Sequence, residues 1–247
     1  MRKPLLFVAL AFAFACKDKP KENKQEAEEV IETVEEKQPE WTNLFDGTSF
    51  DGWHMYNGDE VTEPWKLEDG AMVFYPPENR PDGASYNLVT DTRYTDFVLT
   101  MDWKIAEGGN SGIFWGVMED EQFGQPYLTG PEIQVLDNER HPDAQNGDDR
   151  LAGALYDMVS PSKNVVKPAG EWNNFELMIN HKTNEGHVVL NGTKIVEFPV
   201  QGPEWEELVA NSKFADWEDF AAFETGKIGL QDHGDKVAFR NIKIKEL

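Results

Sequence analysis

The sequence predicts an all-β fold for residues 41–247, a two-sheet sandwich of the jelly-roll type with one or two short helices. Several segments alternate apolar and polar side chains, which is typical of strands that bury one face. One pair of these segments carries a hairpin signal, and a single stretch of the domain has a helical pattern. Many short strands with little helix are typical of sandwiches and jelly rolls.

Residues 1–16 have the composition of an export signal. Two basic residues precede an apolar run from Leu5 to Ala15, which ends at Cys16. The run is shorter than the roughly twenty residues that span a bilayer, but it fits the apolar region of a secretory signal. Because small residues precede the cysteine, the segment resembles a bacterial lipobox. We therefore expect a lipoprotein signal peptide with Cys16 as the site of lipidation.

Residues 17–40 are rich in charge and contain no aromatic side chain. Such a segment cannot bury enough apolar surface to offset the entropy of ordering it, so we predict a flexible acidic tether. Signal and tether together predict a protein held to a membrane by its lipid anchor. Its place would be the bacterial cell envelope, on the periplasmic side or on the outer-membrane surface.

The chain is strongly acidic, with a formal net charge of −23. A surface of this charge repels phosphates, so we do not expect nucleic acid as a partner. The one cysteine lies at the end of the signal, which leaves the domain without a disulfide or a thiol nucleophile.

The clearest strand signals lie in the middle of the domain. In residues 96–106 large apolar side chains recur at every second position from Phe97 to Ile105, and residues 173–180 repeat the pattern. In residues 187–198 two β-branched runs meet at Asn191-Gly192, a pair favoured in the type I′ turn of a hairpin.

Two further strands are predicted in residues 226–234 and 236–247, around a turn that contains glycine. Residues 202–214, GPEWEELVANSKF, are the one stretch that looks helical, with Pro203 suited to the first turn.

A row of polar residues stands out in residues 130–144, GPEIQVLDNERHPDA. Alternation places Glu132 and Gln134 on one face of a strand, but Asp137 has the opposite parity. We predict a β-bulge at Val135-Leu136, which would turn Asp137 onto the face of Glu132 and Gln134. These three side chains would then line a concave surface, with His141 on the loop that leaves it. The alternative is an exposed strand face with ordinary polar residues.

The stretch EIQVLD resembles the Glu-x-Asp-x-x-Glu motif of family 16 glycoside hydrolases, with two departures. Gln134 stands where the motif has its middle Asp, and Asp137 stands where it has the second Glu. A retaining mechanism needs two carboxyl groups about 5–5.5 Å apart, one of them protonated. The departures disfavour that mechanism.

The domain as a whole resembles the 3-keto-disaccharide hydrolase domain family, through motifs that occur in the family's order. The resemblance implies a concanavalin-like jelly roll and an enzyme that cleaves glycosides whose sugar is oxidised at C3. The motifs are WTNLFDGTSFDGW, NSGIFWGV, GPEIQVLDN with HPDA, AGALYDMVSPSKNVVKPAGEWNNFEL, VVLNGTKIVEF and GKIGLQDHGDKVAFRNIKIKEL.

The chemistry of such a substrate suits the polar row. A ketone at C3 acidifies the proton on C2, so that a general base can remove it; the C1 substituent then leaves and water adds back. We predict that Glu132, Asp137 and His141 carry the proton transfers. The same three residues could hold a divalent metal ion that stabilises the enolate, although no cofactor is certain.

The remaining candidates are expected to bind the carbohydrate substrate. Trp115 offers an indole face to a sugar ring, and side-chain amides can bind hydroxyl groups. Tyr156 could pack against a sugar, and Lys167 could steady an enolate oxygen. The full set of predicted binding residues is Asn110, Trp115, Gln134, Tyr156, Lys167, Gln231 and His233.

A second class of function stays open. Jelly rolls also serve as lectin-like modules that bind glycans without cleaving them, so the fold does not decide between enzyme and binding module. In that alternative the acidic residues would hold a structural calcium ion.

Overall fold

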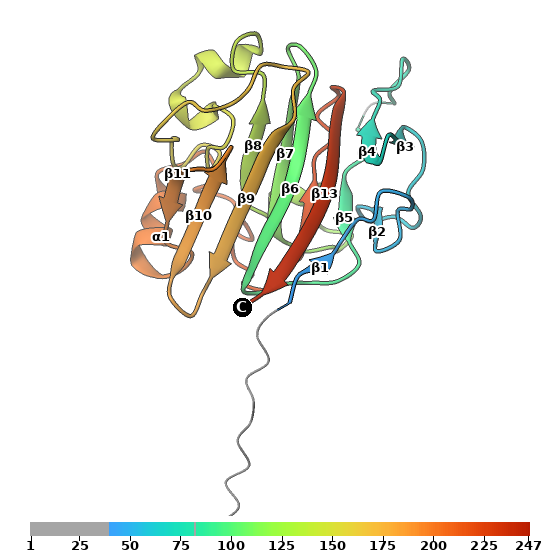
Figure 1. Ribbon diagram of the computed structural model, residues 1–247. Coiled ribbons are helices and arrows are strands. Elements are labelled where there is room, and N and C mark those ends of the chain that lie inside the picture. The colour runs from blue at the N-terminus through green and yellow to red at the C-terminus, as the bar shows by residue number, and fades with distance from the viewer. Residues whose placement is uncertain (1–39, 82) are drawn as a thin grey trace, which may run out of the picture. The chain divides into compact units, whose positions relative to one another are not determined.

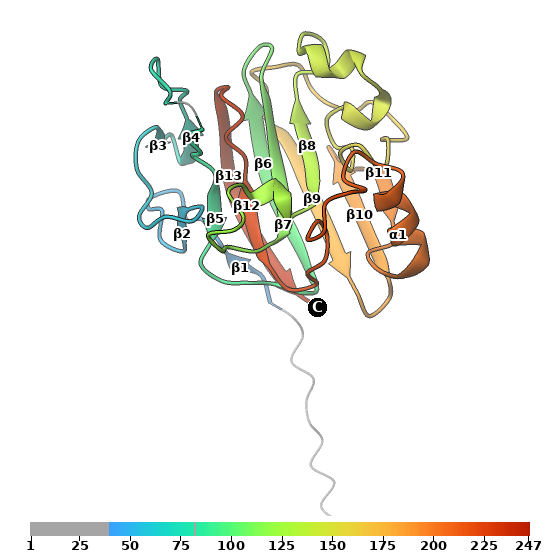
Figure 2. The same cartoon turned by 180° about the vertical axis from the view of Figure 1, so that it is seen from behind.

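The computed structural model describes residues 40–81 and 83–247, which form two antiparallel sheets with one short α-helix (Figures 1 and 2). This confirms the predicted all-β sandwich. The predicted signal peptide with Cys16, and residues 17–39 of the predicted tether, lie outside the described residues.

The larger sheet has eight strands and faces the viewer in Figure 1. Its order is β11-β10-β9-β6-β13-β4-β3, and β1 pairs with β13 at one end. The bounds of its strands are β1 Thr42–Asn43, β3 Trp65–Glu68, β4 Ala71–Phe74, β6 Phe97–Ile105, β9 Asn173–Asn180, β10 Glu185–Leu190, β11 Thr193–Phe198 and β13 Val237–Glu246.

The smaller sheet has five strands in the order β2-β5-β12-β7-β8 and faces the viewer in Figure 2. Its bounds are β2 Trp53–Met55, β5 Leu88–Thr90, β7 Asn110–Val117, β8 Glu132–Leu136 and β12 Lys227–Leu230. The helical segments are α1 Gly202–Ala210 and the 3-10 turns η1 Pro126–Leu128, η2 Pro142–Gln145 and η3 Asp148–Arg150. Within the described residues, no helix has the length and apolarity that a membrane span needs.

Local sequence signals explain several of these elements. Buried and half-buried residues alternate along all of β6, as the period-two pattern predicted. Asn191 and Gly192 have φ angles of 49° and 77°, the left-handed conformations that a type I′ turn between β10 and β11 requires. Helix α1 begins with Pro203 in its first turn, as expected, and ends at Ala210.

The last two predicted strands, β12 and β13, are both present but belong to opposite sheets. The segment that joins them therefore crosses from one layer to the other and does not close a hairpin. Because β12 lies between β5 and β7, the residues that follow it reach the end of the smaller sheet where β7 begins and β8 ends.

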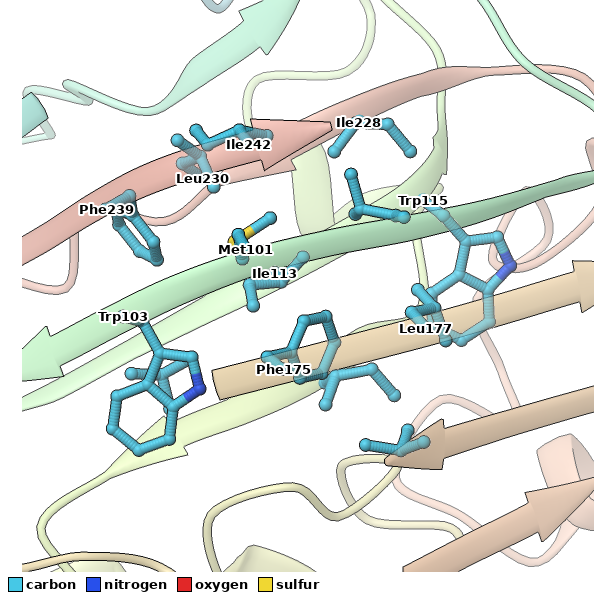
Figure 3. Packing of buried hydrophobic residues seen from close by; sticks show 14 of the residues in the cluster. Met101, Trp103, Ile113, Trp115, Phe175, Leu177, Ile228, Leu230, Phe239 and Ile242 are labelled. Carbon is cyan, nitrogen blue, oxygen red and sulfur yellow. The ribbon is translucent and has the colours of Figure 1, made fainter. Parts of the chain in front are cut away.

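The hydrophobic core fills the space between the two sheets (Figure 3). The larger sheet contributes Trp103, Phe175 and Leu177, and the smaller sheet contributes Ile113 and Leu230, all nearly inaccessible to solvent. This packing makes the smaller sheet a rigid support, whose other face is free to carry a site.

We expect Leu177→Ala to lower the free energy of unfolding by about 2–5 kcal/mol, because it leaves a cavity in this core. Met178→Ala is the matched control, since the neighbouring side chain is half-buried and points away from the core. It should cost less than about 1 kcal/mol. Denaturant unfolding measures both changes, and equal losses would contradict the assigned faces of β9.

Candidate functional site

The site lies on the outer face of the smaller sheet, the face directed away from the larger sheet. Ile113, Ile133 and Val135 belong to the core, whereas Glu132 and Gln134, which alternate with them along β8, point outward. Part of the outer face is apolar and packs Phe114 and Val89 with Tyr56 and Phe123. Beyond this apolar part, β7 and β8 carry polar residues on the same face.

A cavity of about 340 Å³ opens over these polar residues. Its walls come from β7, β8, the turn η1, the residues that follow β12, and two further loop segments. The lining residues are Asn110, Tyr127, Glu132, Gln134, Tyr156, Lys213, Phe214, Trp217, Gln231 and His233. The structure thus brings together six of the residues predicted from the sequence: Asn110, Glu132, Gln134, Tyr156, Gln231 and His233.

Glu132 lies at the bottom of the cavity, over the backbone of Gly112. Phe114 is the direct partner of Glu132 in the β7–β8 ladder, and Gly112 pairs with Gln134. A Cβ atom at Gly112 would fall inside the Glu132 carboxyl group, so this position has space for the carboxyl because it is a glycine.

Burial dominates the electrostatics of Glu132. The residue is only 9% exposed, and withdrawal of its carboxyl from water raises the pKa of Glu132 to about 8. The positive charge of Lys213 opposes this shift and the negative charge of Asp143 adds to it. The carboxyl group therefore keeps its proton in most molecules near neutral pH, and its ionised form is a far stronger base than the carboxylate of an exposed Glu.

Lys213 brings the cationic group of the cavity. The residue as a whole is exposed, but its ammonium nitrogen lies 4.1 Å from the centre of the Tyr156 ring. Partial desolvation of this ammonium lowers the pKa of Lys213, against the attraction of Glu132. A positive charge therefore lies at the cavity wall, where it can stabilise an oxyanion.

Three side-chain amides provide the polar lining around Glu132. The carbonyl oxygens of Asn110, Gln134 and Gln231 are buried and have no hydrogen-bond partner within the described part of the chain. Buried polar atoms rarely lack a hydrogen bond, so we expect a bound ligand to donate hydrogen bonds to these oxygens. The hydroxyl groups of a sugar are suitable donors.

Tyr156 is held in place by charged neighbours and by the backbone. Its N–H donates to the carbonyl of Glu132 at 3.0 Å, so the segment before it runs along β8. Its hydroxyl donates to Asp143 at 3.1 Å and accepts a hydrogen bond from Arg150 at 2.7 Å. Burial and the nearby Asp143 raise the pKa of Tyr156 to about 12, so its phenol stays protonated.

Asp137 does not lie in the cavity, which corrects the sequence prediction. The β7–β8 register continues through Leu136 without the bulge that we expected at Val135-Leu136. The Asp137 carboxylate instead accepts hydrogen bonds from the backbone N–H groups of Gly108 and Glu139 and from Arg140. These bonds outweigh burial and hold the pKa of Asp137 below its ordinary value. Asp137 thus stabilises the turn after β8.

His141 lies behind the cavity wall. Its Nδ1 accepts a hydrogen bond from the Asp143 N–H and caps the short turn η2, while its ring lies 6.3 Å from that of His233. In the described residues no three His, Cys, Asp or Glu side chains gather as a metal centre would require. Glu132, Asp137 and His141 therefore do not form the shared ion site that we expected.

Two other predicted binding residues lie elsewhere. Trp115 has the parity of Ile113, so its indole points into the core, where it stacks on Phe198 with ring centres 5.7 Å apart (Figure 3). Lys167 lies outside the cavity, and its ammonium donates to the carbonyl of Trp172 at 2.8 Å. Neither residue can touch a ligand bound over Glu132.

Sequence reasoning missed four lining residues: Tyr127, Lys213, Phe214 and Trp217. Three of them lie in the segment after α1, which brings them back over the outer face of the smaller sheet. The cluster of aromatic residues around one lysine in KFADWEDF was a usable signal. It gives no indication, however, of which β-strands it packs against.

The arrangement suits removal of a proton from a carbohydrate. Glu132 is the one carboxylate among the residues that line the cavity, so the pair required by a two-carboxylate mechanism is not assembled there. A single strong base beside an ammonium group is the set that proton abstraction next to a carbonyl needs.

Comparison with known proteins points to one family. Residues 40–245 match the model of a family described as the 3-keto-alpha-glucoside-1,2-lyase-like domain. A 3-keto-disaccharide hydrolase from Bacteroides thetaiotaomicron is 36% identical over 231 residues, which cover 84% of this chain and 78% of that protein. These relatives indicate an enzyme of the glycosyl hydrolase type.

Solved structures support the same assignment. A putative glycosyl hydrolase from Parabacteroides distasonis superposes with a TM-score of 0.75 at 36% identity, covering 84% of this chain and 94% of that one. A second from the same organism has a TM-score of 0.63 at 27% identity and covers 84% and 100%. An endo-1,3-beta-glucanase from Thermotoga petrophila shares the fold, with a TM-score of 0.50 at 11% identity, covering 85% and 99%.

The raised pKa of Glu132 predicts how stability depends on pH. In the unfolded chain the carboxyl ionises near its ordinary value of 4.5, whereas the folded protein keeps the proton up to about pH 8. Between these values folding binds a proton. The stabilisation that this proton gives the folded state is therefore fully present below pH 4.5 and is lost as the pH rises through 8. Glu132→Gln removes this loss.

We therefore expect the variant to gain stability relative to the wild type between pH 5 and pH 9, by on the order of a few kcal/mol. Denaturant unfolding across this range measures the difference. Glu171→Gln, a change at an exposed carboxylate, serves as the control and should leave the pH profile unchanged. If the free energies of unfolding of Glu132→Gln and wild type differed by the same amount at every pH, the raised pKa would be contradicted.

Proposed function

Because the chain belongs to the 3-keto-alpha-glucoside-1,2-lyase-like domain family, we propose that it cleaves 3-keto-glycosides, 3-keto-disaccharides among them, by elimination and hydration. The observation that carries the proposal is the buried Glu132, whose pKa of about 8 makes it a strong base in a cavity with no second carboxylate. A ring oxidised at C3 is the substrate on which such a base can act.

The reaction begins with the transfer of the C2 proton to the ionised form of Glu132, whose share increases as the pH approaches 8. The electron pair of the C2–H bond moves towards C3, and the C3 oxygen becomes an enolate. The ammonium of Lys213, at the wall of the same cavity, stabilises this negative charge. The unpaired amide oxygens of Asn110, Gln134 and Gln231 accept hydrogen bonds from the ring hydroxyls.

Collapse of the enolate completes the elimination. A double bond forms between C1 and C2, and the bond from C1 to the glycosidic oxygen breaks. That oxygen takes up the proton that Glu132 received from C2, so the leaving group departs as an alcohol and Glu132 is ionised again. Water then adds across the double bond, with its hydroxyl on C1 and a proton on C2. The net change is hydrolysis of the glycoside.

We expect the purified domain to cleave a 3-keto-α-glucoside and to leave the unoxidised parent intact. Glu132→Gln should lower kcat on the order of a hundredfold or more, because the amide cannot take the proton. Lys213→Met should also lower kcat, since it removes the charge that stabilises the enolate. A chromatographic assay of the released alcohol measures all of these rates.

Lys167→Met is the matched control for Lys213→Met, because it removes an exposed ammonium outside the cavity. It should keep the activity of the wild type. Cleavage of the unoxidised parent would overturn the proposed chemistry. Tight binding of both sugars without turnover would instead favour the lectin-like module.

We also propose that the enzyme is held to a bacterial membrane through a lipid on Cys16, from the lipobox-like sequence before it. Cys16→Ser should prevent processing or release the protein from the membrane fraction, because serine offers no thiol for the lipid. Fractionation followed by immunoblotting distinguishes the two forms. Membrane retention of a correctly cleaved Cys16→Ser product would argue against the anchor.

A further inference from the structure

A second hollow lies beside the cavity that holds Glu132. Its volume is about 290 Å³, and its lining residues are Gln122, Phe123, Leu128, Trp217, Glu218 and Asp219. Trp217 lines both spaces and therefore lies at their common border. The main cavity, at about 340 Å³, is near the lower end of the roughly 300–1,000 Å³ that ligand sites occupy. A substrate larger than one ring therefore extends out of the main cavity.

Trp217 is fixed by aromatic neighbours. Its ring meets that of Phe214 edge to face at 5.1 Å and that of Phe220 at 6.2 Å. Tyr127 lies 6.0 Å from it at an angle of 43° and is 38% exposed, while Trp217 is half-buried, so both rings remain partly accessible. Rigid, exposed aromatic rings of this kind lose little entropy when another ring stacks on them.

The charges around the second hollow restrict what it accepts. Glu218 and Asp219 are its two ionisable lining residues, and no basic residue lines it. The whole chain has a net charge of −23, which adds to the local negative potential. An anionic group is therefore repelled from this hollow, whereas an uncharged ring is not.

We propose that the second hollow is the subsite for the leaving group, and that it selects glycosides whose leaving group is an uncharged ring stacked on Trp217. This inference rests on the proposed function. The keto ring lies over Gly112 and Glu132, among the amides of Gln134 and Gln231. The C1–oxygen bond then points past Trp217, and on cleavage the ring-bearing alcohol, with its added proton, occupies the second hollow.

The test compares wild type, Trp217→Ala and Trp172→Ala on 3-keto-α-glucosides that differ only in the leaving group. The leaving groups are methanol, glucose, 4-nitrophenol and 4-hydroxybenzenesulfonate. Wild type should prefer the two uncharged rings over methyl in kcat/KM, and Trp217→Ala should reduce that preference about five- to tenfold. Trp172→Ala removes a half-buried indole that stacks on Arg240 in the larger sheet and should keep the preference.

The substrate with the sulfonate leaving group tests whether negative charge is rejected. The substrates with glucose and 4-nitrophenol leaving groups show whether the hollow prefers a sugar or an aryl ring. The sulfonate should have a lower kcat/KM than the uncharged aryl compound. Glu218→Gln should reduce this difference in kcat/KM. The proposal is overturned if Trp217→Ala lowers kcat/KM equally for methyl and ring leaving groups, or changes neither.

Experiments with the same variants show whether the subsite or the proposed function is wrong. If wild type cleaves none of the 3-keto-glucosides, the function is wrong, and calorimetry with glucose and 4-nitrophenol then tests the subsite alone. Binding of either ring that is lost in Trp217→Ala supports the subsite. Absence of binding, or equal binding by the variant, overturns it.

Discussion

The structure of the site depends on one constraint, the burial of the Glu132 carboxyl over a glycine in the neighbouring strand. Gly112 leaves the space that the carboxyl fills, and the surrounding side chains keep it from water. If water reached the group, its pKa would return towards that of an ordinary Glu and it would be a weak base. The core side chains on the opposite face of β7 and β8 hold this geometry rigid.

Much of the fold could be predicted from the sequence, because strand alternation records which face is buried. The pattern of β6 and the Asn191-Gly192 turn depend on neighbours along the chain, and both are as expected. The same alternation correctly placed Glu132 and Gln134 on one face of β8. The face of a strand on which a residue lies can therefore be predicted from the neighbouring residues in the sequence.

The predictions for individual site residues were wrong or incomplete where the position of a side chain depends on strand register or on packing between distant segments. We expected Trp115 to bind the ligand because an indole face suits a sugar ring, but its parity with Ile113 places it in the core. Asp137 needed a bulge that the β7–β8 ladder does not contain, and its carboxylate caps a turn instead. Lys213 reaches Glu132 through the packing of a loop that follows α1, and no local pattern predicts such a contact.

The most direct measurement of the central claim is the position of deuterium in the product when the reaction runs in D₂O. Removal of the C2 proton, followed by addition of water, predicts one deuterium bound to C2 of the released 3-keto-sugar. NMR or mass spectrometry detects it, and the released 3-keto-sugar incubated in D₂O with Glu132→Gln is the control for spontaneous exchange through the ketone. A product that keeps its original hydrogen at C2 would contradict the account, because cleavage would then proceed without deprotonation by Glu132.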